Sequence, residues 1–268
     1  MDREHLKGRH PREIRAVIRE GGFNEDTVGL AEGYVQANLV VVPQDQALDL
    51  LIFCQRNPQP CPVLEVTDTG EPSLKYMAQD ADIRTDLAMY KIWEKGRCVA
   101  DVENITDYWS DELVGVLLGC SWSFDWALLN AGIRLRHMEQ GSAAPAYLSS
   151  IQCEPAGVFH GPVVVTMRPI LKHQVARAVQ TSSRYPAAHG APVHVGDPAQ
   201  IGIASLQDEY FGETSSLTEL EPDEVPVFWA CGVTPQAVAI EAHLDFMISH
   251  FPGRMFITDV PIEEIAMF

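Results

Sequence analysis

Residues 119–124, Gly-Cys-Ser-Trp-Ser-Phe, form a glycine turn that leads into an apolar helical stretch. Ser121 or Ser123 can serve as the N-cap of that helix, and backbone N–H groups of the first turn are then left to bind a carboxylate. Ser123 can also act as a hydroxyl donor. An ordinary helix cap has the same residue types, so the pattern fits an anion site or a plain cap.

Residues 231–236, Cys-Gly-Val-Thr-Pro-Gln, repeat this arrangement at the end of an apolar strand. Thr234 is the expected N-cap, Pro235 is suited to the first helical position, and Gln236 follows in the first turn. Ligands of open α/β sheets bind at such strand ends. Cys231 is a candidate thiol donor or nucleophile, although a cysteine that ends an apolar strand is usually buried and inert.

A third group of candidates lies in residues 189–197, a loop with proline and glycine. His189 and His194 can act as general bases, and together with Asp197 they are weak candidates for metal ligands. The spacing matches no short metal-binding motif, and histidines on such a loop are often simply solvated. A divalent metal therefore stays open.

Arg168 follows the apolar residues 163–167, which are typical of a buried strand. A planar guanidinium at a strand end can clamp a substrate carboxylate. With 37 acidic side chains in the chain, an ordinary ion pair is the alternative. The two interpretations are equally balanced on sequence grounds.

The formal charge of −18 at pH 7 disfavours nucleic acid and anionic membrane partners. A small anionic substrate is still compatible, because a pocket can be locally positive. The amino terminus lacks the apolar core of a signal peptide and no later run could span a bilayer, which predicts a cytoplasmic protein. Six cysteines without a CxxC pair indicate neither a zinc site nor a disulfide framework. A homo-oligomer is compatible with these features.

Helical and strand patterns alternate along the 268 residues, which predicts an α/β fold. A helix is expected to begin at Pro11, another to cover residues 47–53, and strands to include residues 63–66, 226–231 and 255–258. The middle of the chain is richer in glycine and proline. We therefore expect residues 116–209 to form a smaller subdomain beside a larger portion made by residues 1–115 and 210–268.

The order of six segments resembles the hydro-lyase family that includes the D-glutamate cyclase domain. These segments are residues 33–38 (with Asn38), 119–124, 161–169, 189–197, 231–236 and 250–259. The resemblance covers nearly the whole chain and implies a three-layer α/β/α portion with a smaller two-layer α/β subdomain. One departure is visible: Trp122 and Asp125 stand where the family usually has phenylalanine and glutamate. The shorter carboxylate puts a catalytic role at position 125 in doubt.

The resemblance implies a hydro-lyase, a carbon-oxygen lyase, which acts on a small carboxylate or amino acid. If it acts as the cyclase, the α-amine of D-glutamate attacks the γ-carboxyl group and water leaves, giving 5-oxo-D-proline. His189 or His194 would be the base and Arg168 the carboxylate anchor, while Ser121, Thr234, Gln236 and Asn38 would bind substrate. Two alternatives are elimination of water from a hydroxy acid and a non-catalytic binding protein for a small amino or carboxylic acid. No nucleotide cofactor is expected, because GxGxxG and GxxxxGK[ST] motifs are missing.

Overall fold

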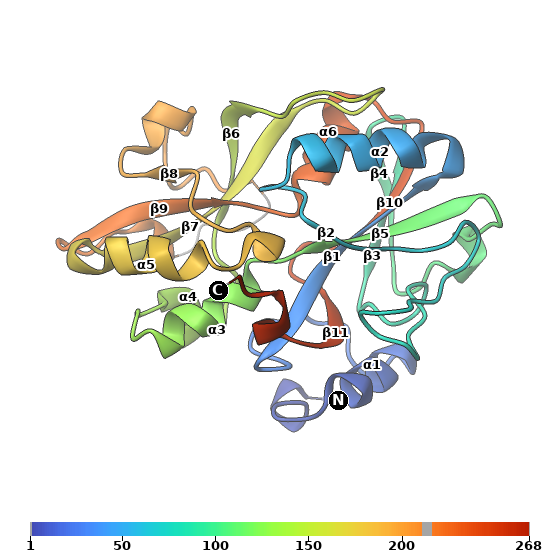
Figure 1. Ribbon diagram of the computed structural model, residues 1–268, viewed down its shortest axis with the longest axis horizontal. Helices are drawn as coiled ribbons and strands as arrows, with labels where there is room; N and C mark the ends of the chain where they lie inside the picture. Colours follow the sequence, from blue (N-terminus) through green and yellow to red (C-terminus); the bar gives the residue numbers. More distant parts are fainter. Residues whose placement is uncertain (1, 211–215, 268) are drawn as a thin grey trace.

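The computed structural model describes residues 2–210 and 216–267, and its strands form two antiparallel sheets (Figure 1). The larger sheet has the order β2-β5-β1-β10-β3-β4, and β11 also pairs with β1. Its strands are β1 (Tyr34–Pro43), β2 (Val63–Val66), β3 (Tyr90–Glu94), β4 (Arg97–Val102), β5 (Leu113–Gly119), β10 (Phe246–His250) and β11 (Phe256–Pro261). The smaller sheet has the order β6-β7-β9-β8, from β6 (Ala146–Gln152), β7 (Pro162–Leu171), β8 (His194–Val195) and β9 (Glu224–Ala230).

Six α-helices pack around these sheets: α1 (Pro11–Arg19), α2 (Gln44–Arg56), α3 (Trp122–Asn130), α4 (Arg136–Gln140), α5 (Val175–Ser182) and α6 (Thr234–Glu241), counted over the described residues. Helix α1 begins at Pro11 as predicted, because proline has no N–H to lose at that position. Helix α2 contains the predicted residues 47–53 and ends before Asn57, whose side-chain amide donates to the Phe53 carbonyl at 2.8 Å. No helix in the described part of the chain is long and apolar enough to cross a membrane.

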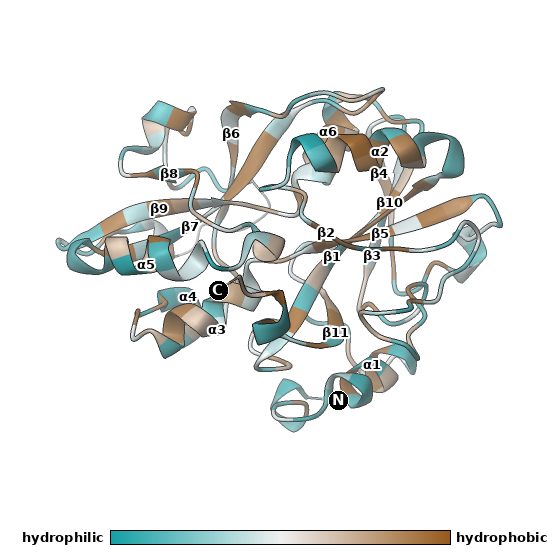
Figure 2. Cartoon of the chain, in the orientation of Figure 1, coloured by the Kyte–Doolittle hydropathy of each residue, from teal (hydrophilic) through white to brown (hydrophobic). Residues whose placement is uncertain are grey.

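The main apolar core joins the two sheets. Val40 of β1 and Phe53 of α2 belong to the same buried cluster as Met167 of β7, Phe228 of β9 and Val238 of α6. The brown strands in the middle of Figure 2 show this apolar interior. A second cluster covers the other face of the larger sheet, and a third packs α3 and α5 against the smaller sheet. The predicted α/β class is confirmed.

The predicted subdomain boundary can be compared with the strand pairing. Strands β6, β7 and β8 of the smaller sheet lie within residues 116–209. Strand β9 follows residue 209 in the sequence but pairs with β7 over seven residues, from Leu171 with Glu224 to Val165 with Ala230. The smaller sheet therefore draws on a later segment, while the division into a three-layer and a two-layer portion stays a prediction.

Candidate active site

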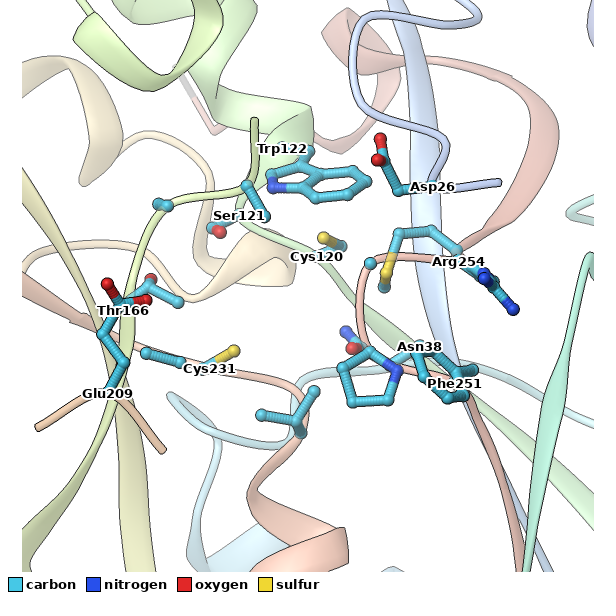
Figure 3. Close-up of a pocket in the computed structure, with 17 residues that line it drawn as sticks. Asp26, Asn38, Cys120, Ser121, Trp122, Thr166, Glu209, Cys231, Phe251 and Arg254 are labelled. Atoms are coloured by element: carbon cyan, nitrogen blue, oxygen red, sulfur yellow. The ribbon is translucent and has the colours of Figure 1, made fainter. Parts of the chain in front are cut away.

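A cavity of about 360 Å³ opens where the two sheets meet (Figure 3). Its lining comes from strands β1, β6 and β7, from the turns between β5 and α3 and between β9 and α6, and from the loop between β10 and β11. Loops before β1, before β6 and between β8 and β9 complete it. The polar and sulfur-bearing residues of this lining are Asp26, Asn38, Cys120, Ser121, Trp122, Thr166, Glu209, Cys231, Arg254 and Met255. Both turns that the sequence singled out therefore meet at one cavity.

Arg168 lies behind the cavity wall and organises it. Its side chain is fully buried, and it holds Asp125 through two bonds, from Nε to Oδ1 at 2.8 Å and from Nη2 to Oδ2 at 2.9 Å. The same guanidinium donates to Thr166 Oγ1 at 3.1 Å and to Ser121 Oγ at 3.0 Å. Arg168 is thus engaged in an ion pair and does not line the cavity, whereas the two hydroxyls that it holds do.

The direction of these bonds fixes what the hydroxyls can do. A guanidinium only donates hydrogen bonds, so Ser121 and Thr166 must accept from Arg168 with their lone pairs. Neither hydroxyl donates to another residue in the described part of the chain. Each therefore keeps its own proton to donate to a ligand in the cavity.

The Asp125 carboxylate is the counter-charge of this wall. Burial raises its pKa, but the charge of Arg168 and the bonds to His137 and Arg168 outweigh burial, and the pKa is lowered overall. His137 Nε2 lies 2.9 Å from Asp125 Oδ2, and its buried Nδ1 has no partner among the described residues. Asp125 thus holds the carboxylate that neutralises Arg168. No sequence pattern pointed to His137.

Asn38 is held at the bottom of the cavity by close backbone contacts. Its amide Nδ2 donates to the Gly119 carbonyl at 2.6 Å. A Cβ atom at Gly232 would lie 1.9 Å from that same nitrogen, and a Cβ atom at Gly119 would lie 1.7 Å from the carbonyl oxygen of Ala187. A side chain at Gly119 would therefore collide with backbone, whereas one at Gly232 would displace the Asn38 amide from its place in the cavity.

Arg254 is the one lysine or arginine among the described residues that line the cavity. Its guanidinium carbon lies 4.5 Å from the ring centroid of Phe251, and its Nη1 donates to Met89 Sδ at 2.6 Å. Asp26, which also lines the cavity, is the strongest of the acidic groups that raise its pKa. Burial lowers the pKa of Arg254, which nevertheless stays cationic at neutral pH because arginine starts so high. It lies in the predicted segment 250–259, but only the structure shows that it lines the cavity.

Three further predicted residues lie close to the cavity without lining it. The Ser123 hydroxyl is buried and bonds the backbone of Gln36, accepting from its N–H at 3.2 Å. The N-cap of α6 is Val233, and Thr234 is the first residue of the helix, contrary to the prediction. The Thr234 hydroxyl donates to the Cys231 carbonyl at 2.7 Å. Gln236 Nε2 donates to the His250 carbonyl at 2.9 Å. These side chains support the two turns structurally.

The two predicted histidine bases do not line the cavity. His189 is buried with Nδ1 2.6 Å from the Gln59 carbonyl oxygen, and burial lowers its pKa to about 4. His194 is half-buried on β8, with Nε2 2.8 Å from the Asp197 backbone oxygen, while the Asp197 carboxylate accepts from the Ala199 N–H. Across the described ranges, no group of three His, Cys, Asp or Glu side chains could hold a metal ion.

Comparison with known proteins places the chain in a family. The family model of D-glutamate cyclase matches residues 114–259. A protein of Thermoanaerobacter sp. (strain X514) is 53% identical over 98% of this chain and 97% of its own length. Proteins of Stutzerimonas stutzeri (strain A1501) and Bacillus subtilis (strain 168) are 52% and 50% identical over 96% of this chain, covering 96% and 99% of their own lengths.

All three relatives bear a provisional hydro-lyase name. A nitrogen repressor-like protein from Methanococcus jannaschii covers 89% of the chain and 91% of its own, but with a TM-score of 0.38 and 9% identity it supports no argument. The matched region contains both helix-start turns, Thr166, Arg168 and Arg254. The protein belongs to the D-glutamate cyclase family, together with these bacterial hydro-lyase relatives.

Proposed function

We propose that the protein is a hydro-lyase that removes water from a small amino-dicarboxylate, with conversion of D-glutamate to 5-oxo-D-proline as its reaction. The observation that carries this proposal is the pair of hydroxyls of Ser121 and Thr166. Both accept a hydrogen bond from Arg168, so each still has its own proton to donate to a ligand in the cavity. Two such donors suit the oxygen of a carboxyl group that gains negative charge during attack on its carbon.

Arg254 supplies the second requirement, an anchor for the other carboxylate. Figure 3 shows Arg254 on the side of the cavity opposite Ser121 and Thr166, with its guanidinium end turned away from them. A substrate with two carboxyl groups can place its α-carboxylate at Arg254, once this side chain turns inward, and its γ-carboxyl group at the hydroxyls. A cavity of about 360 Å³ is at the small end of ligand pockets, which favours a compact substrate.

The chemistry balances within these groups. The α-ammonium group of D-glutamate loses one proton, its nitrogen attacks the γ-carboxyl carbon, and the developing oxyanion accepts bonds from Ser121 and Thr166. The bond between the γ-carbon and one of its oxygens then breaks. The nitrogen loses two protons over the whole reaction, and the departing oxygen takes up both and leaves as water. His189 and His194 do not line the cavity, so the proton acceptor is sought among the lining groups Glu209, Cys120 and Cys231.

Proton NMR of the protein incubated separately with D-glutamate and with 5-oxo-D-proline tests this proposal. Ser121→Ala and Thr166→Val should each lower kcat by about 100-fold or more, as loss of an oxyanion donor does. Arg254→Gln should lower kcat/KM by about 10- to 100-fold, mainly through KM, because a charge-assisted bond is lost. Arg97→Gln, on the exposed start of β4, is the matched control and should have no effect.

The outcomes separate an enzyme from a binding protein. No interconversion by the folded protein in either direction would discard D-glutamate cyclisation. If calorimetry then still shows D-glutamate binding that Arg254→Gln weakens, the cavity belongs to a non-catalytic binding protein. Conversion that survives Ser121→Ala and Thr166→Val unchanged would contradict the role given to the two hydroxyls.

A further inference from the structure

Two cysteines occupy the same local position, directly after a strand, on parts of the cavity wall that come from different sheets. Cys120 directly follows β5 of the larger sheet and lies two residues before α3 begins. Cys231 directly follows β9 of the smaller sheet and lies three residues before α6 begins. Both side chains line the cavity, and Figure 3 shows them on different sides of it with Asn38 and Ser121 nearby. One thiol thus comes from each sheet.

We propose that Cys120 and Cys231 form an acid–base pair that acts on the α-carbon of a bound amino acid from two sides, so that the protein exchanges the α-hydrogen and interconverts the enantiomers. This inference rests on the proposed function only in that the cavity accepts a small amino acid with an α-carboxylate. It does not require cyclisation.

The step conserves atoms and electrons without a further reactant. One cysteine, as thiolate, takes the α-proton, and the electron pair of the broken C–H bond spreads onto the α-carboxylate. The thiol of the other cysteine then gives its proton to the opposite face of the α-carbon. The product is the other enantiomer, and the two cysteines have exchanged protonation states, so the reverse reaction begins from the product state.

The surroundings of the two sulfurs contain groups that favour the thiolate form. Overall the pKa of both thiols is raised: burial is the largest influence, and the neighbouring Cys231 and Asp125 act in the same direction on Cys120. Against it, the N–H of Trp122 acts on Cys120, the N–H groups of Val233 and Gly232 act on Cys231, and the charge of Arg168 lowers the pKa of both. Helix N-termini and a nearby cation are the usual features around a functional thiolate.

The same cavity can stabilise the intermediate. When the α-proton leaves, negative charge grows on the substrate carboxylate. A cation and hydrogen-bond donors stabilise this charge most strongly in a site with little water. Arg254 and the Ser121 and Thr166 hydroxyls are such groups.

The other four cysteines do not line the cavity. Cys54, Cys61 and Cys153 are buried in the apolar core, and Cys98 is exposed on β4.

The test follows D-glutamate and L-glutamate separately in D₂O, with proton NMR for the α-hydrogen and chiral chromatography for the enantiomers. The wild-type protein should wash out the α-proton signal and produce the opposite enantiomer. Cys120→Ser and Cys231→Ser should each reduce racemisation by about 100-fold or more, as loss of an acid or base does. Each thiol acts on one face of the α-carbon. One variant should therefore lose exchange of the α-hydrogen mainly with D-glutamate, and the other mainly with L-glutamate.

Cys98→Ser is the control and should behave as wild type. Circular dichroism and calorimetric binding of D-glutamate show whether each cysteine variant still folds and binds, so that lost exchange is not mistaken for lost structure. An α-proton signal that persists for both enantiomers with the wild-type protein overturns the inference, as does exchange that both serine variants retain. The spectra also report 5-oxoproline: cyclisation without α-exchange overturns only this inference, and α-exchange without cyclisation overturns only the cyclase reaction.

Discussion

Replacing Arg168 by methionine should remove the buried guanidinium that connects Asp125 with the Ser121 and Thr166 hydroxyls. The change keeps an apolar stem of similar length but removes both bonds to Asp125 and the bonds to Ser121 and Thr166. Asp125 would then remain as a fully buried carboxylate with His137 as its remaining side-chain partner among the described residues. Removing one partner of a buried ion pair costs about 3–5 kcal/mol of the free energy of unfolding.

The size of this loss can be checked by equilibrium urea unfolding and by the melting temperature. Trp229 is a suitable fluorescent reporter, because the Arg168 guanidinium carbon lies 5.3 Å from its ring centroid. For a chain of this size the loss corresponds to a fall of roughly 6–20 °C in Tm. The double variant Arg168→Met with Asp125→Leu should recover most of the stability, because two apolar side chains then replace the pair.

Activity should not recover with stability. In the double variant nothing orients the Ser121 and Thr166 hydroxyls, so turnover should stay low in a well-folded protein. This combination identifies Arg168 as a positioning residue and not merely a structural one. The reasoning would be refuted by a loss below about 1 kcal/mol in the single variant, by a double variant as unstable as the single one, or by a stable double variant with full activity.

Two further changes test the packing around the site. Burial lowers the pKa of His250 to about 4. Between pH 6.5 and 4 this histidine is therefore protonated in the unfolded chain but not in the folded one, so the free energy of unfolding falls as the pH falls. Unfolding at pH 7 and pH 5 should show that His250→Gln makes this fall smaller by about 2 kcal/mol; an unchanged difference would mean that His250 already accepts a proton in the folded state. Gly119→Ala should cost more stability than Gly232→Ala, because its Cβ would meet the Ala187 carbonyl while the Asn38 amide can rotate away; equal melting temperatures would contradict this.

The sequence by itself determined much of the local structure of this protein and singled out two turns that border the candidate cavity. Proline at a helix start and apolar strand runs were sufficient to predict α1, β2 and the interior of β7, because these signals act over a few neighbouring residues. The turns before α3 and α6 were also recognised, and the cavity lies beside both of them.

Only the tertiary structure decided which side chains share the cavity. For Arg168 the sequence left a carboxylate anchor and an ordinary ion pair equally open, because its partner Asp125 lies 43 positions away and no local pattern signals a pair at that distance; the structure shows the ion pair. The same limit explains why Arg254 and Cys120 were not singled out and why His189 and His194 were. Residue type and spacing indicate what chemistry a side chain can do, whereas burial and neighbours decide whether a substrate can reach it.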